Sequence, residues 1–502
     1  RVATAVVPRI PPPMLDLVIR HARLPDANDG AVADIAIANG RIADIAPSIA
    51  TEAPSFDAEG RLTCAGLVET HIHLDKSRIV DRCAPEPSRS SPDHMKRVQA
   101  VKAAFTVEDI YERAKATLEA CIKHGATRIR THAEIDPPVG TKGVEALQLL
   151  AKEYAWAVDL EICVFPQEGL TNMPDTDAAL VAGLKRGVRA IGAAPNYDTD
   201  HPGQINRIYA LGREYGVEID MHIDSGHDPA SMDTHLVADL TERYKLGGHV
   251  AMGHMTKLAG LPPARQREIA SRLADAGVAV TVLPSTDLFV LARHADHNVP
   301  RCVADANLLA EHGCTCSIST NNVLNPFTPF GDGSLIRMAN LHANILQVGQ
   351  PDRLAALFGM ITTQSARLLN LTDYGISVGN PADIAIIENL TPAAPRAVDY
   401  YRRNDEQHRI HLKLFVRGKP IPLSERVPVL ENIGFRVINE RTYRIGAPES
   451  ERTALHDMLI EQLAGDELVA PPYAELPAAA VERLIAAMDE KTAELGSKTA
   501  TN

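Results

Sequence analysis

Apolar and polar residues alternate in a strand-like pattern at two places that lie far apart in the chain. From Leu15 to Ile45 the alternation runs around short turns, and a similar stretch returns from Gly379 to Ile387 and continues to Ile421. Alternation with a period of two is typical of short strands with one buried face. Because these two blocks flank a long middle region, we expect one small β-sandwich built from residues 14–63 and residues 376–425.

The middle region, from about Leu67 to Leu371, repeats a different unit. A short apolar run ends in polar residues, and chain long enough for an amphipathic helix follows; eight such runs occur. Eight βα units are what a closed parallel barrel requires, and the C-terminal ends of its strands form the active-site face. The polar and ionisable residues fall at those ends. We therefore predict an α/β fold with a (β/α)8 TIM barrel over residues 64–375.

The end of the chain shows a third pattern. The segments SERTALHDMLIEQLAG and LPAAAVERLIAAMDEKTAEL have apolar residues at helical spacing, with Glu and Lys on the opposite face. We therefore expect a C-terminal helical extension over residues 426–502. It would serve either in docking and oligomer contacts or as a solvated cap.

Composition narrows the classes of partner. The 502-residue chain carries a formal net charge of −13 and shows no basic stripe, so we expect no nucleic-acid partner. No apolar run approaches the roughly 20 residues that span a bilayer, so we expect no membrane partner. The seven cysteines are an odd number without a CxxC pair. They indicate buried thiols of a cytoplasmic protein rather than a disulfide framework.

Histidines mark the ends of three of the predicted barrel strands. His71 and His73 lie on the first strand, where side chains two residues apart point to the same side. His222 ends the fifth apolar run, and His254 ends the sixth. Buried imidazoles need a metal ion or a hydrogen-bond network to satisfy them, and imidazole is a common ligand of transition metals. The four histidines therefore predict a metal site at the active-site face of the barrel.

An ordered set of motifs adds a family resemblance. The motifs are HIHLDK (71–76), RTHAEID (130–136), FPQEG (165–169), DMHID (220–224), GHMT (253–256), NPFTPFG (325–331) and SARLLNLTDYGISVGNPADI (365–384). In this order they resemble the cytosine deaminase branch of the amidohydrolase superfamily, over nearly the whole region from Leu15 to Ile421. FPQEG and the last motif are much more specific than HxH alone. The resemblance implies a barrel enzyme that forms a homo-oligomer.

The resemblance also implies a role for each matching position. One divalent transition metal ion would be bound by the two HxH histidines, the strand-five histidine and the residue at the end of strand eight. Zinc or iron comes first, and manganese and cobalt also suit imidazole ligands. The strand-six histidine would act in catalysis, and the glutamine of FPQEG would bind the substrate. By position these residues are His71, His73, His222 and Asn321 for the metal, His254 for catalysis, and Gln167 and Asn322 for the substrate.

Two positions depart from the family pattern. The strand-five motif HxDE has a glutamate that moves protons, where this chain has Ser225, and the strand-eight aspartate that binds the metal is replaced by Asn321. Asparagine offers a neutral oxygen that cannot take a proton. We expect Asp224 to act as general base, because it lies two residues from the strand-five histidine on the same strand. His227 and Asp228 are alternatives, and so is a shift of this loop by a position or two.

These residues predict a metal-dependent hydrolase. Metal-activated water would attack a C–N bond in a small cyclic amide, amidine or urea-like compound. Two alternatives stay open. One is a cytosine-type deaminase that releases ammonia, which the missing glutamate disfavours, and the other is a non-catalytic ligand-binding barrel. Asp75 and Lys76 either contact a polar substrate or form a solvated pair, and His132 either supports the metal site or is hydrogen-bonded structure.

Overall fold

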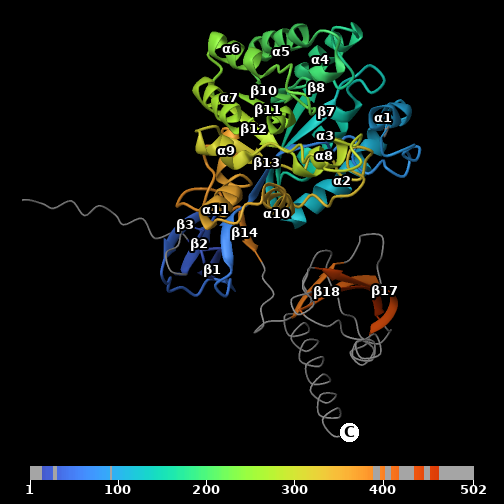
Figure 1. The fold of residues 1–502 in the computed structure, drawn as a ribbon. Helices are drawn as coiled ribbons and strands as arrows, with labels where there is room; N and C mark the ends of the chain where they lie inside the picture. Colours follow the sequence, from blue (N-terminus) through green and yellow to red (C-terminus); the bar gives the residue numbers. More distant parts are fainter. Residues whose placement is uncertain are drawn as a thin grey trace, which may run out of the picture. The chain divides into compact units, whose positions relative to one another are not determined.

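The computed structural model describes residues 14–25, 31–90, 93–387, 396–401, 409–417, 435–445 and 453–462. The chain divides into two units, of which the first ends at Ile386. The first unit contains an eight-stranded parallel sheet and two small sheets, and the second contains a separate antiparallel sheet (Figure 1).

The predicted barrel is confirmed. Its eight strands lie side by side in chain order, and backbone hydrogen bonds join the first strand to the residues that follow the last. The Asn321 N–H donates to the His71 carbonyl at 2.9 Å, and the His73 N–H donates to the Asn321 carbonyl at 2.8 Å. The strands are β6 (Leu67–Ile72), β7 (Ala126–Glu134), β8 (Asp159–Phe165), β9 (Ala190–Ile191), β10 (Glu218–Ile223), β11 (Val250–His254), β12 (Val278–Val282) and β13 (Cys316–Ile318).

Helices surround the barrel, and local sequence signals mark several of their ends (Figure 1). The Thr106 hydroxyl accepts from the Asp109 N–H at the start of α2, and Asp200 and Ser334 cap α5 and α10 in the same way. None of the described helices is both long and apolar enough to cross a bilayer. The helices are α1 (His94–Lys102), α2 (Val107–Lys123), α3 (Lys142–Glu153), α4 (Asp175–Lys185), α5 (His201–Tyr215), α6 (Thr234–Tyr244), α7 (Pro263–Ala276), α8 (Pro284–Val290), α9 (Ala306–Glu311), α10 (Leu335–Leu346), α11 (Pro351–Gly359) and α12 (Thr363–Leu368).

Two small sheets complete the first unit. One has the strand order β3-β2-β1-β4, and the other pairs β5 with β14. Ile19, Ile35 and Ile384 contribute to one apolar core, so segments from both ends of the unit pack together as expected for the small domain. Arg128 of the barrel forms an ion pair with Asp383 at 2.7 Å. The strands are β1 (Leu17–Ala22), β2 (Ala33–Ala38), β3 (Arg41–Ala46), β4 (Ser55–Asp57), β5 (Leu62–Ala65) and β14 (Ile384–Ile387).

The second unit corrects two parts of the predicted organisation. β15 (Arg396–Tyr401) and β16 (Arg409–Arg417) pair with each other and not with the N-terminal sheet, so they do not belong to the small sandwich. β17 (Phe435–Ile445) and β18 (Thr453–Gln462) are strands where a helical extension was expected. The helical prediction is wrong there because β18 pairs along its length with β16 and β17, and local spacing does not reveal such long-range pairing. Residues 463–502 of the predicted extension lie outside the described residues.

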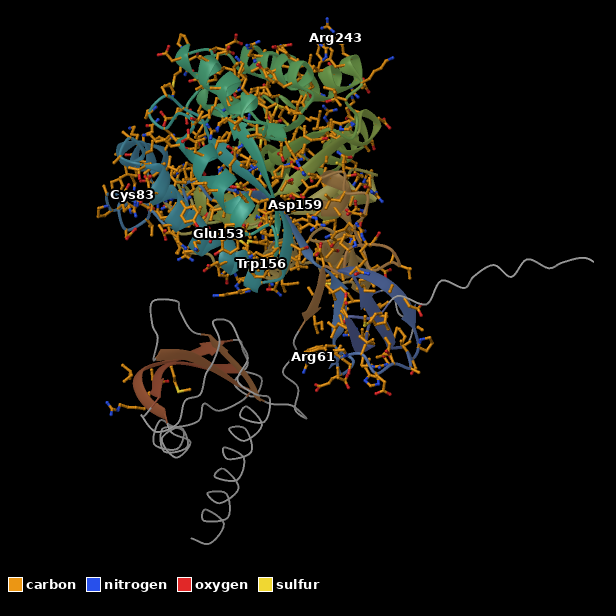
Figure 2. All side chains as sticks on the ribbon, turned by 180° about the vertical axis from the view of Figure 1, so that it is seen from behind. Arg61, Cys83, Glu153, Trp156, Asp159 and Arg243 are labelled. Atoms are coloured by element: carbon orange, nitrogen blue, oxygen red, sulfur yellow. The ribbon has the colours of Figure 1, made fainter. Side chains whose placement is uncertain are left out.

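The turn between α3 and β8 marks the end of the barrel opposite the histidines. Trp156 in this turn is 81% exposed, and Asp159 begins β8 (Figure 2). The histidines lie at the C-terminal ends of the strands, which is the active-site face of such barrels. The site is therefore built from the C-terminal ends of the strands and the loops that follow them.

Candidate active site

The structure brings three of the predicted metal ligands together. The Nε2 atoms of His71 and His73 each lie 3.1 Å from the Nε2 atom of His222. All three side chains are buried. Burial first, and then nearby positive charges, lower the pKa of each imidazole well below its usual value. Three uncharged imidazoles that face one another offer lone pairs to a transition metal.

Asn321 joins this group from the end of the last strand. Its φ of 62° and its backbone hydrogen bonds to His71 and His73 hold it beside β6. Its Oδ1 atom is buried and has no hydrogen-bond partner among the described residues. Such an acceptor is costly unless a cation or a donor reaches it. The fourth predicted ligand therefore offers an oxygen that the rest of the described chain leaves unsatisfied.

A buried carboxylate supports the histidines from within the barrel. The His132 ring stacks on the His71 ring with 3.8 Å between centroids, and its Nε2 atom lies 3.5 Å from Asp220 Oδ1. His71 Nδ1 lies 4.0 Å from the same oxygen, and Arg130 donates to the other oxygen at 3.0 Å. Burial acts to raise the pKa of Asp220, but His132 and Arg130 outweigh it and lower the pKa. His132 is thus part of the support of the histidine cluster. With His71 and Asp220 it also forms a second group close enough to hold an ion.

His254 is held in one orientation by a carboxylate that the sequence did not single out. The Nδ1 atom of His254 lies 2.6 Å from Asp287 Oδ1, in the first turn of α8. Burial raises the pKa of Asp287, and the nearby His254 opposes this shift. Because Nδ1 is engaged by the carboxylate, the Nε2 atom of His254 is left for the cavity. A buried imidazole oriented by a carboxylate is suited to proton transfer.

Several of these groups line a cavity with an open volume of about 520 Å³, which includes solvent at its mouth. The wall combines imidazoles, amides, hydroxyls and a few apolar side chains. It consists of His73, Lys76, Gln167, Ala194, Asn196, Tyr197, His222, Ser225, His254, Thr286, Asp287, Val290, Leu291, Asn321, Asn322 and Phe327.

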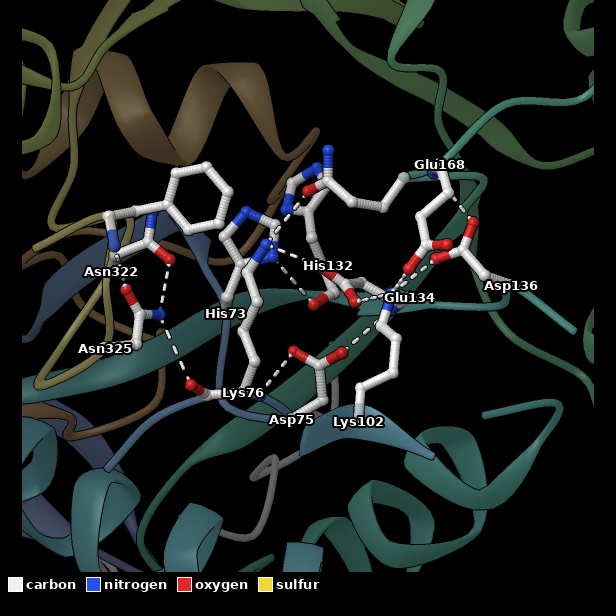
Figure 3. Close-up of polar contacts among 12 residues, drawn as sticks. His73, Asp75, Lys76, Lys102, His132, Glu134, Asp136, Glu168, Asn322 and Asn325 are labelled. Atoms are coloured by element: carbon white, nitrogen blue, oxygen red, sulfur yellow. Dashed lines mark hydrogen bonds and ion pairs between the residues drawn. The ribbon is translucent and has the colours of Figure 1, made fainter. Parts of the chain in front are cut away.

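A buried ionic network forms one side of this cavity. Lys76 Nζ donates to Glu134 Oε1 at 2.7 Å and to Gln167 Oε1 at 2.9 Å. Lys102 Nζ lies 2.5 Å from Glu134 Oε2 and 2.9 Å from Asp136 Oδ2, so both lysines converge on Glu134 (Figure 3). Burial acts to raise the pKa of Glu134, but the two lysines outweigh it and lower the pKa to about 2. Lys76 is therefore a buried, paired cation at the cavity and not part of a solvated loop tip.

Gln167 and Asn322, the predicted substrate contacts, both line the cavity. Gln167 lies in the loop after β8, where Lys76 fixes its carboxamide oxygen. Asn322 follows the predicted ligand Asn321, and its Oδ1 atom accepts from Asn325 Nδ2 at 2.7 Å (Figure 3). Both carboxamides are thus held by neighbours and present their remaining atoms to the cavity.

Asp224 is not placed to act as the predicted general base. Its φ of 51° turns the chain away from the strand direction, so the assumption that it continues the strand face fails. Its carboxylate accepts from the backbone N–H groups of Asp233 at 2.9 Å and Thr234 at 3.1 Å, at the start of α6. Lys257 Nζ lies 3.5 Å from it. The prediction is wrong because this carboxylate holds the start of a helix and is not among the residues that line the cavity.

The other candidates in the same loop do not replace it. His227 and Asp228 are exposed and are also not among the residues that line the cavity. Ser225, at the position of the family's glutamate, does line it. Within the described part of the chain, the ionisable pair on the wall that is suited to proton transfer is therefore His254 with Asp287.

Comparisons with known proteins give the family. The profile described as "Amidohydrolase family" matches residues 143–421, more than half of the chain. The chain belongs to the amidohydrolase family. N-isopropylammelide isopropyl amidohydrolase of Pseudomonas sp. strain ADP is 27% identical over 397 residues, which are 75% of this chain and 92% of that protein. Pterin deaminase of Rhizobium rhizogenes is 27% identical over 369 residues, which are 70% of this chain and 82% of that protein. Members of the family hydrolyse C–N bonds in small molecules with a divalent metal ion, so the predicted enzyme class is confirmed.

Solved structures agree with this amidohydrolase assignment. The 5-methylcytosine deaminase of Klebsiella pneumoniae, solved with 5-fluorocytosine, is 26% identical with a TM-score of 0.70, over 74% of this chain and 90% of that one. The N-isopropylammelide isopropylaminohydrolase of Burkholderia multivorans is 25% identical with a TM-score of 0.64, over 75% of this chain and 93% of that one. The predicted resemblance to the cytosine deaminase branch is therefore confirmed.

The second unit of this amidohydrolase matches a different family. Residues 395–470 match the profile "Glutamate dehydrogenase, ACT3 domain". The NAD-specific glutamate dehydrogenase of Halomonas elongata is 40% identical over 87 residues, which are 17% of this chain and 5% of that protein. The strands β15 to β18 fall within the matched range.

Sequence reasoning missed two parts of the site. Asp287 follows the seventh apolar run by a few residues, and an acidic residue just beyond a strand end was a usable signal. The pairing of Lys76 with Glu134 joins residues far apart in the sequence, and only the closed barrel brings them together. No local pattern predicts that pair.

Proposed function

We propose that this chain hydrolyses a C–N bond in a small cyclic amide, amidine or urea-like compound. One divalent metal ion would be held by His71, His73, His222 and Asn321. The observation that carries the proposal is the convergence of three imidazole Nε2 atoms, at contacts of 3.1 Å, in a buried site. The names of the relatives, which are an isopropylammelide amidohydrolase, a pterin deaminase and a 5-methylcytosine deaminase, support a small nitrogen-containing substrate.

The residues present fit such an ion. A neutral imidazole has one N–H and one nitrogen lone pair. In the described chain the Nδ1 atoms of His71 and His222 and the Oδ1 atom of Asn321 have no hydrogen-bond partner. A cation among the converging Nε2 atoms and this oxygen would satisfy the lone pairs that these atoms direct into the site. When bound, zinc or iron, or alternatively manganese or cobalt, lowers the pKa of a bound water and polarises the C=O or C=N bond under attack.

His254 and Asp287 would move the protons. Asp287 accepts from Nδ1–H of His254, which leaves the Nε2 lone pair toward the cavity. That atom can take a proton from the attacking water and return it to the leaving nitrogen. The pair would do the work for which the family uses a glutamate, where this chain has Ser225. Gln167 and Asn322 would orient the substrate through their cavity-facing atoms.

Cytosine-type deamination uses the same groups and differs in its leaving group, which is ammonia instead of an amine or ring nitrogen. The deaminases among the relatives favour this second candidate, and the serine at position 225 counts against it. We also propose a homo-oligomer in the cytoplasm without a nucleic-acid partner. The net charge of −13 supports the last point.

The test is metal content by elemental analysis together with product release. We expect about one metal ion per chain in the wild type, little in His71→Ala, and a wild-type level in the control His297→Ala, whose side chain is 82% exposed. A panel of cyclic amides, cyclic ureas and aminopyrimidines is then assayed separately for primary amine and for ammonia. A wild-type protein that takes up none of the four metals would contradict the hydrolase and favour a barrel that only binds.

A further inference from the structure

We propose that the cavity recognises its substrate through an acceptor-rich edge. Three polar groups fixed on its wall all present N–H donors. This inference rests on the proposed function and names its substrate class: a ring whose carbonyl oxygens face Lys76, Gln167 and Asn322. It follows from the hydrogen bonds that fix each of these side chains.

The orientation of Gln167 is set by Lys76. A lysine ammonium group can only donate, so the atom 2.9 Å from Lys76 Nζ must be the carboxamide oxygen. Lys76 is itself held by Glu134 at 2.7 Å. Gln167 lines the cavity, and no described residue accepts a hydrogen bond from its Nε2 atom. Gln167 therefore turns its NH₂ group to the cavity.

The orientation of Asn322 is set by backbone groups on the other side. The N–H groups of residues 327 and 328 donate to Asn325 Oδ1 at 3.0 and 3.2 Å, so the other terminal atom of Asn325 must be Nδ2. This Nδ2 atom donates to Asn322 Oδ1 at 2.7 Å (Figure 3). The NH₂ group of Asn322 is then left for the cavity, where a threonine hydroxyl lies at the limiting distance of 3.5 Å. Asn322 also acts as a donor.

Lys76 supplies the third donor. Its ammonium group has three N–H bonds, and the hydrogen bonds in the described chain use two of them, to Glu134 and Gln167. Its Nζ atom lies 4.9 Å from the centre of the Phe327 ring, which covers one side. The third N–H is left for a ligand, and a carbonyl oxygen of a ring can accept from it.

A ring that presents amino groups to this wall would set N–H against N–H. Each buried donor left without an acceptor costs binding energy, and a site built for one hydrogen-bond pattern rejects the opposite pattern strongly. The wall therefore selects against amino-substituted edges as well as for carbonyl edges.

Two nearly isosteric substitutions isolate the donors. Gln167→Glu and Asn322→Asp keep the oxygen that accepts from Lys76 or Asn325 and replace only the cavity-facing NH₂ group by an oxygen. The probes are barbiturate, which presents ring oxygens, and triaminopyrimidine, which presents amino groups. Calorimetry on the metal-loaded full chain gives the ratio of the two dissociation constants. We expect the wild type to prefer barbiturate by about tenfold or more, and each substitution to lower this ratio by about tenfold or more.

A further variant separates hydrogen bonding from charge. Gln167→Met removes the donor without adding a negative charge, so we expect weaker binding of barbiturate and no gain for triaminopyrimidine. We expect Gln167→Glu to bind triaminopyrimidine more tightly, because its new oxygen accepts a hydrogen bond from an amino group. Thermal melting of each variant confirms folding, and the carboxylate of Gln167→Glu keeps a partner in Lys76.

The inference is overturned if the wild type prefers triaminopyrimidine, if it binds neither ring at millimolar concentration, or if both isosteric variants keep the wild-type ratio. Metal content and turnover are measured on the same samples. If the substitutions reverse a preference for barbiturate in a protein without metal or turnover, the proposed function is contradicted and the inference about the N–H donors is supported. If the protein turns over substrate but the ratio of dissociation constants is unchanged by the substitutions, the proposed function is supported and the inference is overturned.

Discussion

At the scale of single residues, Asn321 is the predicted ligand whose charge would set how strongly a cation is held. Three imidazoles and an amide carry no charge, whereas an Asn321→Asp substitution would place a carboxylate at the same buried position. We expect metal affinity to rise by on the order of 10- to 100-fold, measured by competition with a chelator. Asn344→Asp, on the exposed part of α10, is the matched control and should leave affinity unchanged. An unchanged affinity in Asn321→Asp would mean that this position does not face the ion.

Asp287 controls which nitrogen of His254 carries the proton. An Asp287→Asn substitution offers an NH₂ group to Nδ1 and favours the opposite tautomer, so that Nε2 loses its lone pair. We expect kcat to fall by about 10²- to 10⁴-fold while metal content stays at the wild-type level. The readout is kcat on the best substrate of the panel, with the pH profile recorded for both proteins. A loss confined to KM would contradict a role in proton transfer.

The histidines that sequence reasoning brought to one face of the barrel share one property. His71, His222 and His254 lie on strands and His73 directly follows one, so alternation and the strand end dictate where each side chain goes. Asp224 breaks this logic because a left-handed backbone conformation turns it toward α6. Contacts such as Lys76 with Glu134 depend on the closed barrel and leave no local trace in the sequence.

At the scale of elements, Asp224 anchors the start of α6. Replacing it by alanine removes the acceptor for two backbone N–H groups and the partner of Lys257. We expect a loss of about 2 kcal/mol in the free energy of unfolding, measured by urea denaturation. Asp239→Ala, on the same helix with a 69% exposed side chain, should cost less than about 0.5 kcal/mol. If Asp224→Ala instead abolished turnover without lowering the free energy of unfolding, the result would support Asp224 as the general base.

The network that joins α1, β7 and the loop after β8 makes stability depend on pH. Burial raises the pKa of Asp136 to about 6, although Lys102 opposes this. Folding thus favours the protonated acid. Its contribution to the free energy of unfolding is complete below the pKa in the unfolded chain, about 4, and is lost as the pH rises through about 6.

Asp136→Asn should therefore flatten the fall of the unfolding free energy between about pH 4 and pH 6. Urea denaturation at several pH values measures this slope, and Asp352→Asn at the exposed start of α11 serves as the surface control. Equal slopes in wild type and Asp136→Asn would show that this acid does not titrate in that range.

Elements whose pattern is local were predicted more reliably than those fixed by distant partners. The barrel strands end in polar residues, and this repeated signal gives their number and order. β18 has apolar residues at spacings that suit both a helix and a strand, and its pairing with β16 and β17 decides between them. The short strand β9, with two residues, shows that tertiary closure can also define a strand that local propensity barely supports.

At the scale of the whole molecule, the two units should be separable. Among the described strands, none of β15 to β18 pairs with a strand of the first unit. A chain ending at Ile387 should keep its metal content and melt within about 4 °C of the full chain, because the barrel loses no strand partner. Differential scanning calorimetry measures this. Aggregation of the shortened chain, or loss of its metal, would show that the first unit depends on the second.

The fixed carboxamides have a consequence for how such barrels diverge. Gln167, Asn321 and Asn322 are each one base change away from an acid, because glutamine and glutamate codons, like asparagine and aspartate codons, differ at their first base. Each change would leave the backbone and the three histidines untouched and would reverse one donor or add one charge. A gene lineage could therefore move between substrates and metal affinities in single mutational steps. Paralogues with nearly identical barrels should accordingly be sorted by these three codons before overall identity is consulted.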